Sequence, residues 1–314
     1  MSNAVLEFRG VVKRYGRRTA LDGLDLAVER GVILGLVGSN GAGKTTALLA
    51  AAGLIRPTRG EIRVFGNGAF DPARQAGRLS LVPQDSDLPR HATVRSLLHF
   101  YGRLQGLTAR EAEGAALAML ERCHLADRAG STIRALSHGM RKRVMLAQAL
   151  IGEPELVLLD EPMSGLDPVE VANVRGILTD RRGRQTIVMS SHVLTEVERM
   201  CDRVAFIERG SCQRQDSVAE LLGRLQVLRY VLGAGAVPVE DLRALLPDAD
   251  FAAPDALATD RERVLVCRFG DGRPVEEINA LVLECLLRRG VGVREIRRGG
   301  ELEDAYLRHR AGGT

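Results

Sequence analysis

The segment that most constrains the fold of this chain is a glycine-rich turn between an apolar run and a helical run. Residues 32–37, VILGLV, have the pattern of a buried strand, and an alanine- and leucine-rich segment with helical character follows residue 46. The turn between them, GSNGAGKTT, matches the phosphate-binding pattern G-x-x-x-x-G-K-[ST]. Strand, turn and helix in this order predict an α/β fold whose turn binds phosphate groups.

Each part of this turn has a physical role toward bound phosphates. The glycines let the backbone curl so that successive N–H groups point at phosphate oxygens, and the helix that follows adds its positive N-terminal end. Lys44 is expected to reach the β- and γ-phosphates, and the Thr45 hydroxyl to bind Mg²⁺. Only three of the 44 basic residues are lysines, so a lysine here indicates a need for a compact charge on a thin stem. The expected phosphate contacts are Gly38, Ser39, Asn40, Gly41, Ala42, Gly43, Lys44, Thr45 and Thr46.

A second apolar run ends in a pair of carboxylates. Residues 156–162 read LVLLDEP, which predicts a buried strand that ends at Asp160. An open α/β sheet presents its ligand groups at such strand ends, so Asp160 is expected to hold Mg²⁺ directly or through water. The adjacent Glu161 is expected to take a proton from an attacking water. Acidic pairs at strand ends are common in isolation, and this interpretation depends on the phosphate-binding turn upstream.

A further motif narrows the class of protein. The segment LSHGM, residues 136–140, precedes a predicted helix and resembles the signature of ABC transporters, usually written LSGGQ. Ser137 and Gly139 match that pattern, whereas His138 and Met140 depart from it. Ser137 can cap the helix that follows, and Gly139 leaves room for a phosphate.

The order of these motifs resembles the ATP-binding domain of an ABC transporter over about residues 4–222. The resemblance implies ATP and Mg²⁺ as cofactors, ATP hydrolysis as the activity, and a homodimer that holds ATP between its two chains. In the family the signature faces the nucleotide of the other chain. Cross-dimer contacts with ATP are therefore implied for Ser137 and Gly139, and also for Asp167 in SGLD, which resembles the D-loop.

Three single residues match the family elsewhere in the chain. Gln84 resembles the Q-loop glutamine, which implies contact with Mg²⁺ and the attacking water. His192 resembles the switch histidine that contacts the γ-phosphate, and Tyr15 lies where the family places an aromatic ring under the adenine. A lone histidine after a strand usually serves packing or solvation, so the order of the motifs carries these assignments. The implied catalytic set is Glu161, His192 and Gln84, and the implied Mg²⁺ ligands are Thr45, Gln84 and Asp160.

The resemblance also implies a partner and a location. It implies an integral membrane permease as partner and a peripheral position on the cytoplasmic face of the membrane. The LSxGM form of the signature and the tail segment ELEDAYL are similar to exporter subunits. The alternative is a soluble ABC ATPase that acts on ribosomes or DNA, but such proteins usually carry two nucleotide-binding domains or a long coiled coil. A net charge of only +4 gives no reason to expect nucleic-acid binding.

The pattern of elements predicts a P-loop NTPase core, a mainly parallel sheet with helices. An N-terminal antiparallel β subdomain and an all-helical insert over about residues 86–152 belong to the same domain, residues 1–222. Residues 223–314 are expected to form a small C-terminal α/β domain, for which a ferredoxin-like βαββαβ order is one possibility. The role favoured for this domain is stabilisation of the dimer, with ligand sensing as the alternative.

Export of the chain and disulfide bonding are not expected. The first ten residues lack a basic lead followed by an apolar stretch, and the longest apolar run, residues 47–55, is about half of the ~20 residues that a spanning helix needs. The five cysteines form no C-x-x-C pair, which favours a reducing cytosol over a disulfide framework or a zinc site.

Overall fold

The computed structural model describes residues 4–84, 87–223, 227–252, 263–270, 273–298 and 302. The chain divides into two compact units, Met1–Ser217 and Val218–Thr314. The domain boundary expected after residue 222 stays a prediction. Within the described ranges, no helix combines the length and the apolar character that crossing a bilayer requires.

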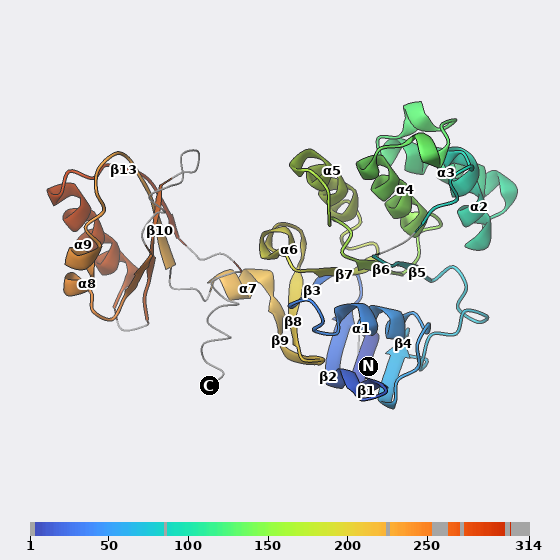
Figure 1. Ribbon diagram of the computed structural model, residues 1–314, viewed down its shortest axis with the longest axis horizontal. Helices are drawn as coiled ribbons and strands as arrows, with labels where there is room; N and C mark the ends of the chain where they lie inside the picture. Colours follow the sequence, from blue (N-terminus) through green and yellow to red (C-terminus); the bar gives the residue numbers. More distant parts are fainter. Residues whose placement is uncertain are drawn as a thin grey trace. The chain divides into compact units, whose positions relative to one another are not determined.

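The first unit begins with a three-stranded antiparallel sheet in the order β2-β1-β4 (Figure 1). Its strands are β1 (Ala4–Tyr15), β2 (Arg18–Glu29) and β4 (Arg59–Val64). The two long strands are joined by a tight turn at Gly16, whose φ is 58°. Apolar side chains alternate into one face of this sheet, which is the pattern of a half-buried sheet.

A six-stranded sheet in the order β5-β6-β7-β3-β8-β9 forms the centre of the first unit. Its strands are β3 (Ile33–Val37), β5 (Leu79–Val82), β6 (Leu156–Asp160), β7 (Thr186–Ser191), β8 (Arg203–Glu208) and β9 (Ser211–Ser217). All neighbours are parallel except β8 and β9. Strands β3, β6 and β7 are buried at every position. The residues that follow these three strands therefore meet at one edge of the sheet.

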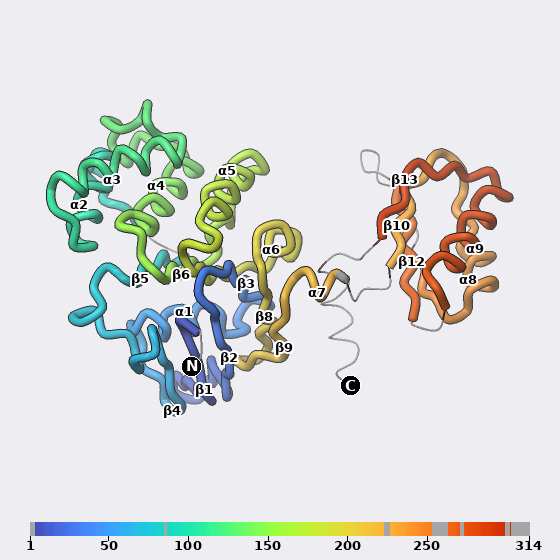
Figure 2. Tube along the Cα trace, turned by 180° about the vertical axis from the view of Figure 1, so that it is seen from behind, coloured from blue at the N-terminus to red at the C-terminus, as the bar shows by residue number. Residues whose placement is uncertain are grey.

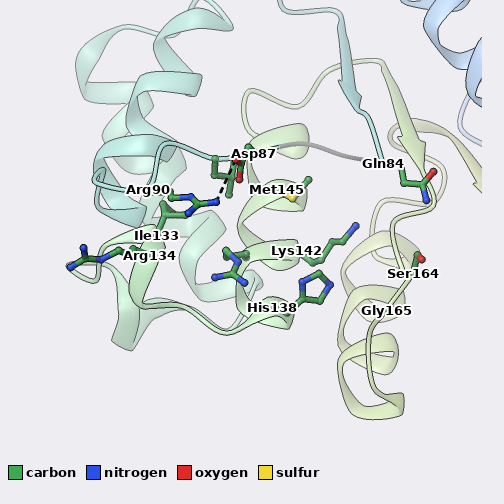
Figure 3. A pocket seen from close by; sticks show the side chains of 12 residues that line it. Gln84, Asp87, Arg90, Ile133, Arg134, His138, Lys142, Met145, Ser164 and Gly165 are labelled. Atoms are coloured by element: carbon green, nitrogen blue, oxygen red, sulfur yellow. Dashed lines mark ion pairs between the residues drawn. The ribbon is translucent and has the colours of Figure 1, made fainter.

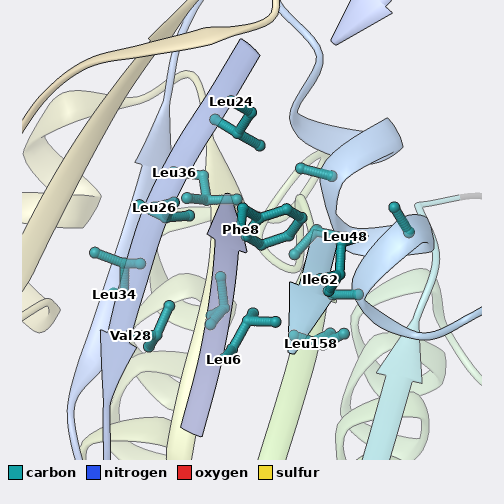
Figure 4. Close-up of a cluster of buried hydrophobic side chains, with 14 of the residues drawn as sticks. Leu6, Phe8, Leu24, Leu26, Val28, Leu34, Leu36, Leu48, Ile62 and Leu158 are labelled. Atoms are coloured by element: carbon teal, nitrogen blue, oxygen red, sulfur yellow. The ribbon is translucent and has the colours of Figure 1, made fainter. Parts of the chain in front are cut away.

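The core of the first unit lies between the two sheets (Figure 4). Phe8 and Leu26 of the antiparallel sheet, Leu36 and Leu158 of the central sheet, and Leu48 of α1 belong to one buried cluster. Helix α1 (Lys44–Ala51) starts within the GSNGAGKTT segment, directly after Gly43. Because α1 is packed between both sheets, the turn at its N-terminus has a fixed position.

The predicted helical insert is present and lies beside β5 and β6 (Figures 1 and 2). Its elements are α2 (Val94–Leu104), α3 (Ala109–Arg122), η1 (Ala126–Arg128), η2 (Ile133–Ala135) and α4 (His138–Leu150). Side chains cap its three α-helices: Thr93 caps α2, Thr108 forms a capping box with Glu111 at α3, and Ser137 caps α4. After the insert, α5 (Pro168–Thr179) and α6 (Leu194–Met200) connect strands of the central sheet.

The second unit starts with α7 (Val218–Gly223) and has a core of its own. Its sheet is antiparallel in the order β11-β12-β10-β13, and α8 and α9 lie together on one face of it (Figure 2). The elements are β10 (Val227–Leu232), α8 (Val239–Leu245), β11 (Asp250–Ala252), β12 (Val264–Arg268), α9 (Val275–Arg288) and β13 (Val293–Arg298). From β10 onward their order is βαββαβ. The tail segment ELEDAYL, residues 301–307, lies outside the described residues, apart from Leu302.

Candidate functional site

The glycines of the phosphate-binding turn are required by close packing. A Cβ on Gly38 would lie 2.2 Å from the Ile207 carbonyl oxygen, and one on Gly43 would lie 2.6 Å from the Ala20 carbonyl oxygen. Gly43 is also in a left-handed conformation, with φ 111°, as the N-cap of α1. Because these positions carry no side chain, the backbone N–H groups of the turn stay accessible, and phosphate oxygens can approach them.

Lys44 lies inside this loop and is only 6% exposed. Its Nζ donates hydrogen bonds to the carbonyl oxygens of Gly38, at 2.7 Å, and Ser39, at 3.2 Å. Burial lowers the pKa of Lys44, while the charges of Glu161 and Asp160 oppose that change. The ammonium group is thus held inside the loop, within electrostatic reach of Asp160 and Glu161 at the end of β6.

Asp160 carries a free ligand position for a cation. The residue is 2% exposed, and its Oδ1 accepts a 2.5 Å hydrogen bond from Ser190 Oγ. Its Oδ2 is buried and has no hydrogen-bond partner among the residues that the structure describes. A buried carboxylate oxygen without a donor is costly, and a divalent cation is the ligand that would satisfy it. The donor set at the end of β6 therefore fits Mg²⁺.

Glu161 and His192 meet at the same edge of the sheet. His192 Nδ1 lies 3.1 Å from Glu161 Oε2, which makes an ion pair when the imidazole is protonated. Glu161 has φ 47°, an uncommon conformation for a residue with a side chain, and its N–H donates to Ser190 Oγ at 2.8 Å. A small cavity of about 200 Å³ lies over Glu161, Ser190 and His192 and extends to Gly165. This geometry can hold and deprotonate a water molecule.

One residue of the signature segment, His138, lines a larger cavity of about 680 Å³ (Figure 3). Ser137 Oγ accepts a hydrogen bond from Met140 N at 3.2 Å, as expected for a helix cap. His138 points from the start of α4 toward Gly165, where a Cβ would lie 3.4 Å from the His138 Nε2. Gln84 lines the same cavity at the end of β5. The other charged lining residues are Asp87, Arg90, Arg134, Arg141 and Lys142, so the cavity wall is mainly basic.

Asp167 and Tyr15 lie in separate places. Asp167 caps α5 because its Oδ1 accepts from Glu170 N at 2.9 Å. Tyr15 ends β1 with its ring half exposed, and Lys13 Nζ lies 5.0 Å from the ring centroid. Arg18, the strand partner of Tyr15, brings Nη2 within 3.4 Å of a Cβ built on Gly41. The first hairpin therefore lies next to the phosphate-binding turn.

Sequence reasoning missed Ser190 and Arg18 as parts of the site. Ser190 joins Asp160 to the backbone of Glu161 from a neighbouring strand, and TIVMSS contains two serines with no pattern that tells them apart. Arg18 is one of many arginines in the chain and follows a plain Arg-Tyr-Gly-Arg turn. Only the pairing of distant segments identifies either residue.

The comparisons with known proteins identify the family that the chain resembles. The family model of the ABC transporter matches residues 21–164. The chain is 33% identical to the Nod factor export ATP-binding protein I of Ralstonia nicotianae, with 98% of this chain and 94% of the relative covered. It is 36% identical to the daunorubicin resistance ATP-binding protein DrrA3 of Streptomyces coeruleorubidus, with 92% and 93% covered. A solved structure of the ATP-binding subunit of an ABC transporter matches with a TM-score of 0.63 at 27% identity, covering 70% of this chain and 92% of that one.

Fold and site together define a P-loop ATPase, which confirms the predicted fold class. With relatives of this similarity along nearly its whole length, the chain belongs to the family of ABC transporter ATP-binding proteins. It binds ATP and hydrolyses it.

Proposed function

We propose that this chain energises a separate membrane permease from the cytoplasmic face of the membrane, and that the transport it drives is export. The observation that carries the proposal is that the Lys44 turn after β3 and the Asp160–Glu161 pair at the end of β6 lie at the same edge of the central sheet, where both strands pair in parallel with β7. The printed names of the two relatives refer to Nod factor export and daunorubicin resistance, which supports the export direction. These names speak against the alternative of an ATPase on ribosomes or DNA.

The reaction needs an aligned water and positive charge that neutralises the negative charge of the γ-phosphate. We assign Mg²⁺ to Thr45, Gln84 and Asp160; the ion would supply positive charge at the β- and γ-phosphates. The Lys44 ammonium adds charge from inside the turn. Glu161 accepts the proton of the attacking water, and His192, 3.1 Å away, orients that carboxylate.

The second half of the site would come from another copy of the chain. In this proposal Ser137, Gly139 and Asp167 contact the ATP bound by the Lys44 turn of the partner. One observation supports the assignment of Ser137, because it is the N-cap of α4 and helix N-termini attract phosphate. ATP would then favour the closed dimer because its cross-dimer contacts exist only in that state.

The C-terminal domain, residues 223–314, would be a ferredoxin-like domain that stabilises the dimer. The βαββαβ order and the separate hydrophobic core support the fold assignment. The described residues of this unit offer no group of His, Cys, Asp and Glu side chains fit to hold a metal ion.

Purification of the tagged full-length chain from its native membranes tests the proposal. Recovery with a multi-spanning membrane protein, together with Mg²⁺-dependent ATP turnover by the complex, is the expected result. A Lys44→Ala chain should be recovered with the same protein but show no turnover. Recovery with ribosomes or DNA, without a membrane protein, would contradict the permease assignment.

A further inference from the structure

We infer that Glu170 is a positioning residue that locks the signature segment of α4 to the D-loop at the start of α5. The inference rests on the proposed function, in which both segments contact ATP bound by a partner chain. Glu170 does not touch the Lys44 turn in this role. It acts through Arg143 and Gly139, and it sets where Ser137 and Asp167 stand relative to each other.

The Arg143 guanidinium makes the contacts that connect α4 to α3 and α5. Its side chain is 7% exposed, and its Nη1 donates to the carbonyl oxygens of Cys123, at 2.8 Å, and His124, at 3.0 Å. Its Nη2 donates to Glu170 Oε1 at 3.3 Å, and its Nε lies 3.0 Å from Glu170 Oε2 as an ion-pair contact outside hydrogen-bond alignment. One side chain of α4 thereby joins the end of α3 to the first turn of α5.

Gly139 provides the second contact. A Cβ at this buried position would lie 2.7 Å from Glu170 Cδ and 2.8 Å from Cγ. A free glutamate could swing away from such a methyl group, but this carboxylate is held by Arg143 and is only 19% exposed. The space left by the missing side chain of Gly139 is therefore taken by Glu170. We conclude that the signature needs a glycine here for packing as well as for any phosphate.

The same residue also reaches the D-loop. The backbone N–H of Glu170 donates to Asp167 Oδ1 at 2.9 Å, while its side chain is pressed against α4. Ser137 caps α4 only two residues before Gly139. Glu170 thus contacts both the Asp167 cap, through its backbone, and the start of α4 that Ser137 caps, through its side chain. We expect it to fix the position of one cap relative to the other.

A buried ion pair is weak evidence for stability, since its desolvation cost can equal its attraction. We expect the Arg143–Glu170 pair to act by fixing the positions of Ser137 and Asp167 relative to each other. Its loss should therefore weaken dimer formation. In a Glu161→Gln background, which is expected to keep ATP bound, Glu170→Gln removes the charge with little change in volume. We expect the protein concentration for half-maximal ATP-dependent dimerisation to rise about tenfold. The Kd of the single chain for Mg²⁺-ATP should stay within about twofold, since the Lys44 turn is untouched.

Glu153→Gln is the matched control. Glu153 Oε1 lies 3.3 Å from Nη1 of Arg181, whose side chain is 4% exposed, so this change also strips a buried arginine of its carboxylate. Glu153 lies away from the signature and the D-loop. In the Glu161→Gln background, Glu153→Gln should therefore dimerise at the same protein concentration as Glu161→Gln alone. Equal shifts from Glu153→Gln and Glu170→Gln would show a general loss of stability and would overturn the inference.

The parent variant separates this inference from the proposed function. If Glu161→Gln alone forms no ATP-dependent dimer, the proposed pairing is wrong. If the parent dimerises and Glu170→Gln dimerises at the same protein concentration, the pairing stands and the positioning role is wrong. Both outcomes are measured by analytical sedimentation of the full-length chain with and without Mg²⁺-ATP.

A second pair of variants decides the question if Glu170→Gln does not fold. Gly139→Ala should weaken dimerisation because its methyl group meets the held carboxylate. Glu170→Asp shortens that side chain by one methylene and keeps its charge, so Gly139→Ala with Glu170→Asp should recover part of the loss. A double variant no better than Gly139→Ala alone would overturn the contact between these two positions.

Discussion

At the scale of single residues, the hydroxyl of Ser190 connects the two acids of the site. It donates to Asp160 Oδ1 and accepts from the backbone N–H of Glu161, so one oxygen fixes both the Asp160 carboxylate and the backbone of Glu161, whose φ is positive. The left-handed conformation of Glu161 turns the chain sharply after β6 and directs its carboxylate to His192. Backbone strain of this kind is maintained only where neighbouring contacts hold it.

Glu161→Gln is predicted to bind ATP and to persist as an ATP-dependent dimer with little turnover. The amide keeps the size of the side chain but cannot accept a proton from water, so kcat should fall by about 10²- to 10⁴-fold. Phosphate release and analytical sedimentation measure the two effects. Phosphate release near the wild-type rate would rule out Glu161 as the base.

Ser190→Ala is predicted to lower kcat/KM about tenfold and to raise the Mg²⁺ concentration needed for activity. The change leaves Asp160 Oδ1 and the Glu161 N–H without their partner, at a cost of about 1–3 kcal/mol. Ser190→Thr keeps the hydroxyl and is the control. A threonine variant as impaired as the alanine variant would mean that packing in β7, not the hydrogen bonds, is responsible.

At the scale of elements, charged pairs tie strands of the central sheet to the antiparallel sheet. Glu155, just before β6, lies 2.5 Å from Arg78 Nε, just before β5, and 2.6 Å from Arg30 Nη1, just after β2. The hydrogen bond from Arg78, then that from Arg30, lowers the pKa of Glu155 against an opposing effect of burial. Both ion pairs of Glu155 are partly exposed, so solvent screening limits their contribution to the free energy of unfolding.

Glu155→Gln is predicted to reduce stability near neutral pH by less than about 1 kcal/mol. Because the folded-state pKa is below the unfolded value of about 4.3, the stabilisation is present above that value and is lost as the pH falls through the folded pKa. Denaturant unfolding curves of wild type and variant should therefore differ at pH 7 and converge in acid. At pH 7 the difference should also shrink in about 1 M salt. A difference that grows in acid would contradict this sign.

The elements differ in how far the sequence predicts them. The buried strands β3, β6 and β7 and the helical insert follow from local apolar patterns, and the site residues at their ends follow from motifs. Strand β9, with the sequence SCQRQDS, was not predicted because it is a polar edge strand that only pairing with β8 stabilises. Helix α8 and strand β11 are short and have weak patterns. The Arg143–Glu170 contact joins residues of two different helices and leaves no local signal.

At the scale of the whole molecule, two units with separate cores should respond differently to ligand. All residues assigned to ATP and Mg²⁺ belong to the first unit, and the second unit has its own sheet and buried cluster. A ligand that binds only the folded state stabilises the unit that binds it. Unfolding of the chain should therefore not be a single two-state transition.

Calorimetry of the full-length chain is predicted to show two transitions, of which Mg²⁺-ATP raises one. At a ligand concentration 100 times Kd the gain is about 2.7 kcal/mol, which corresponds to a rise in Tm of about 5–10 °C for a unit of this size. Lys44→Ala should abolish the rise without shifting the other transition. A rise of both transitions together would indicate that the units unfold cooperatively.

The separate hydrophobic core of the second unit has a consequence for the evolution of the chain. A module whose apolar side chains pack into a core of its own can be exchanged by recombination as a unit. Relatives with different tails could then keep the same chemistry, and chimaeras that carry a relative's tail should still turn over ATP. Selection on the tail is thereby freed from the demands of catalysis, and the two parts of the gene can diverge at different rates.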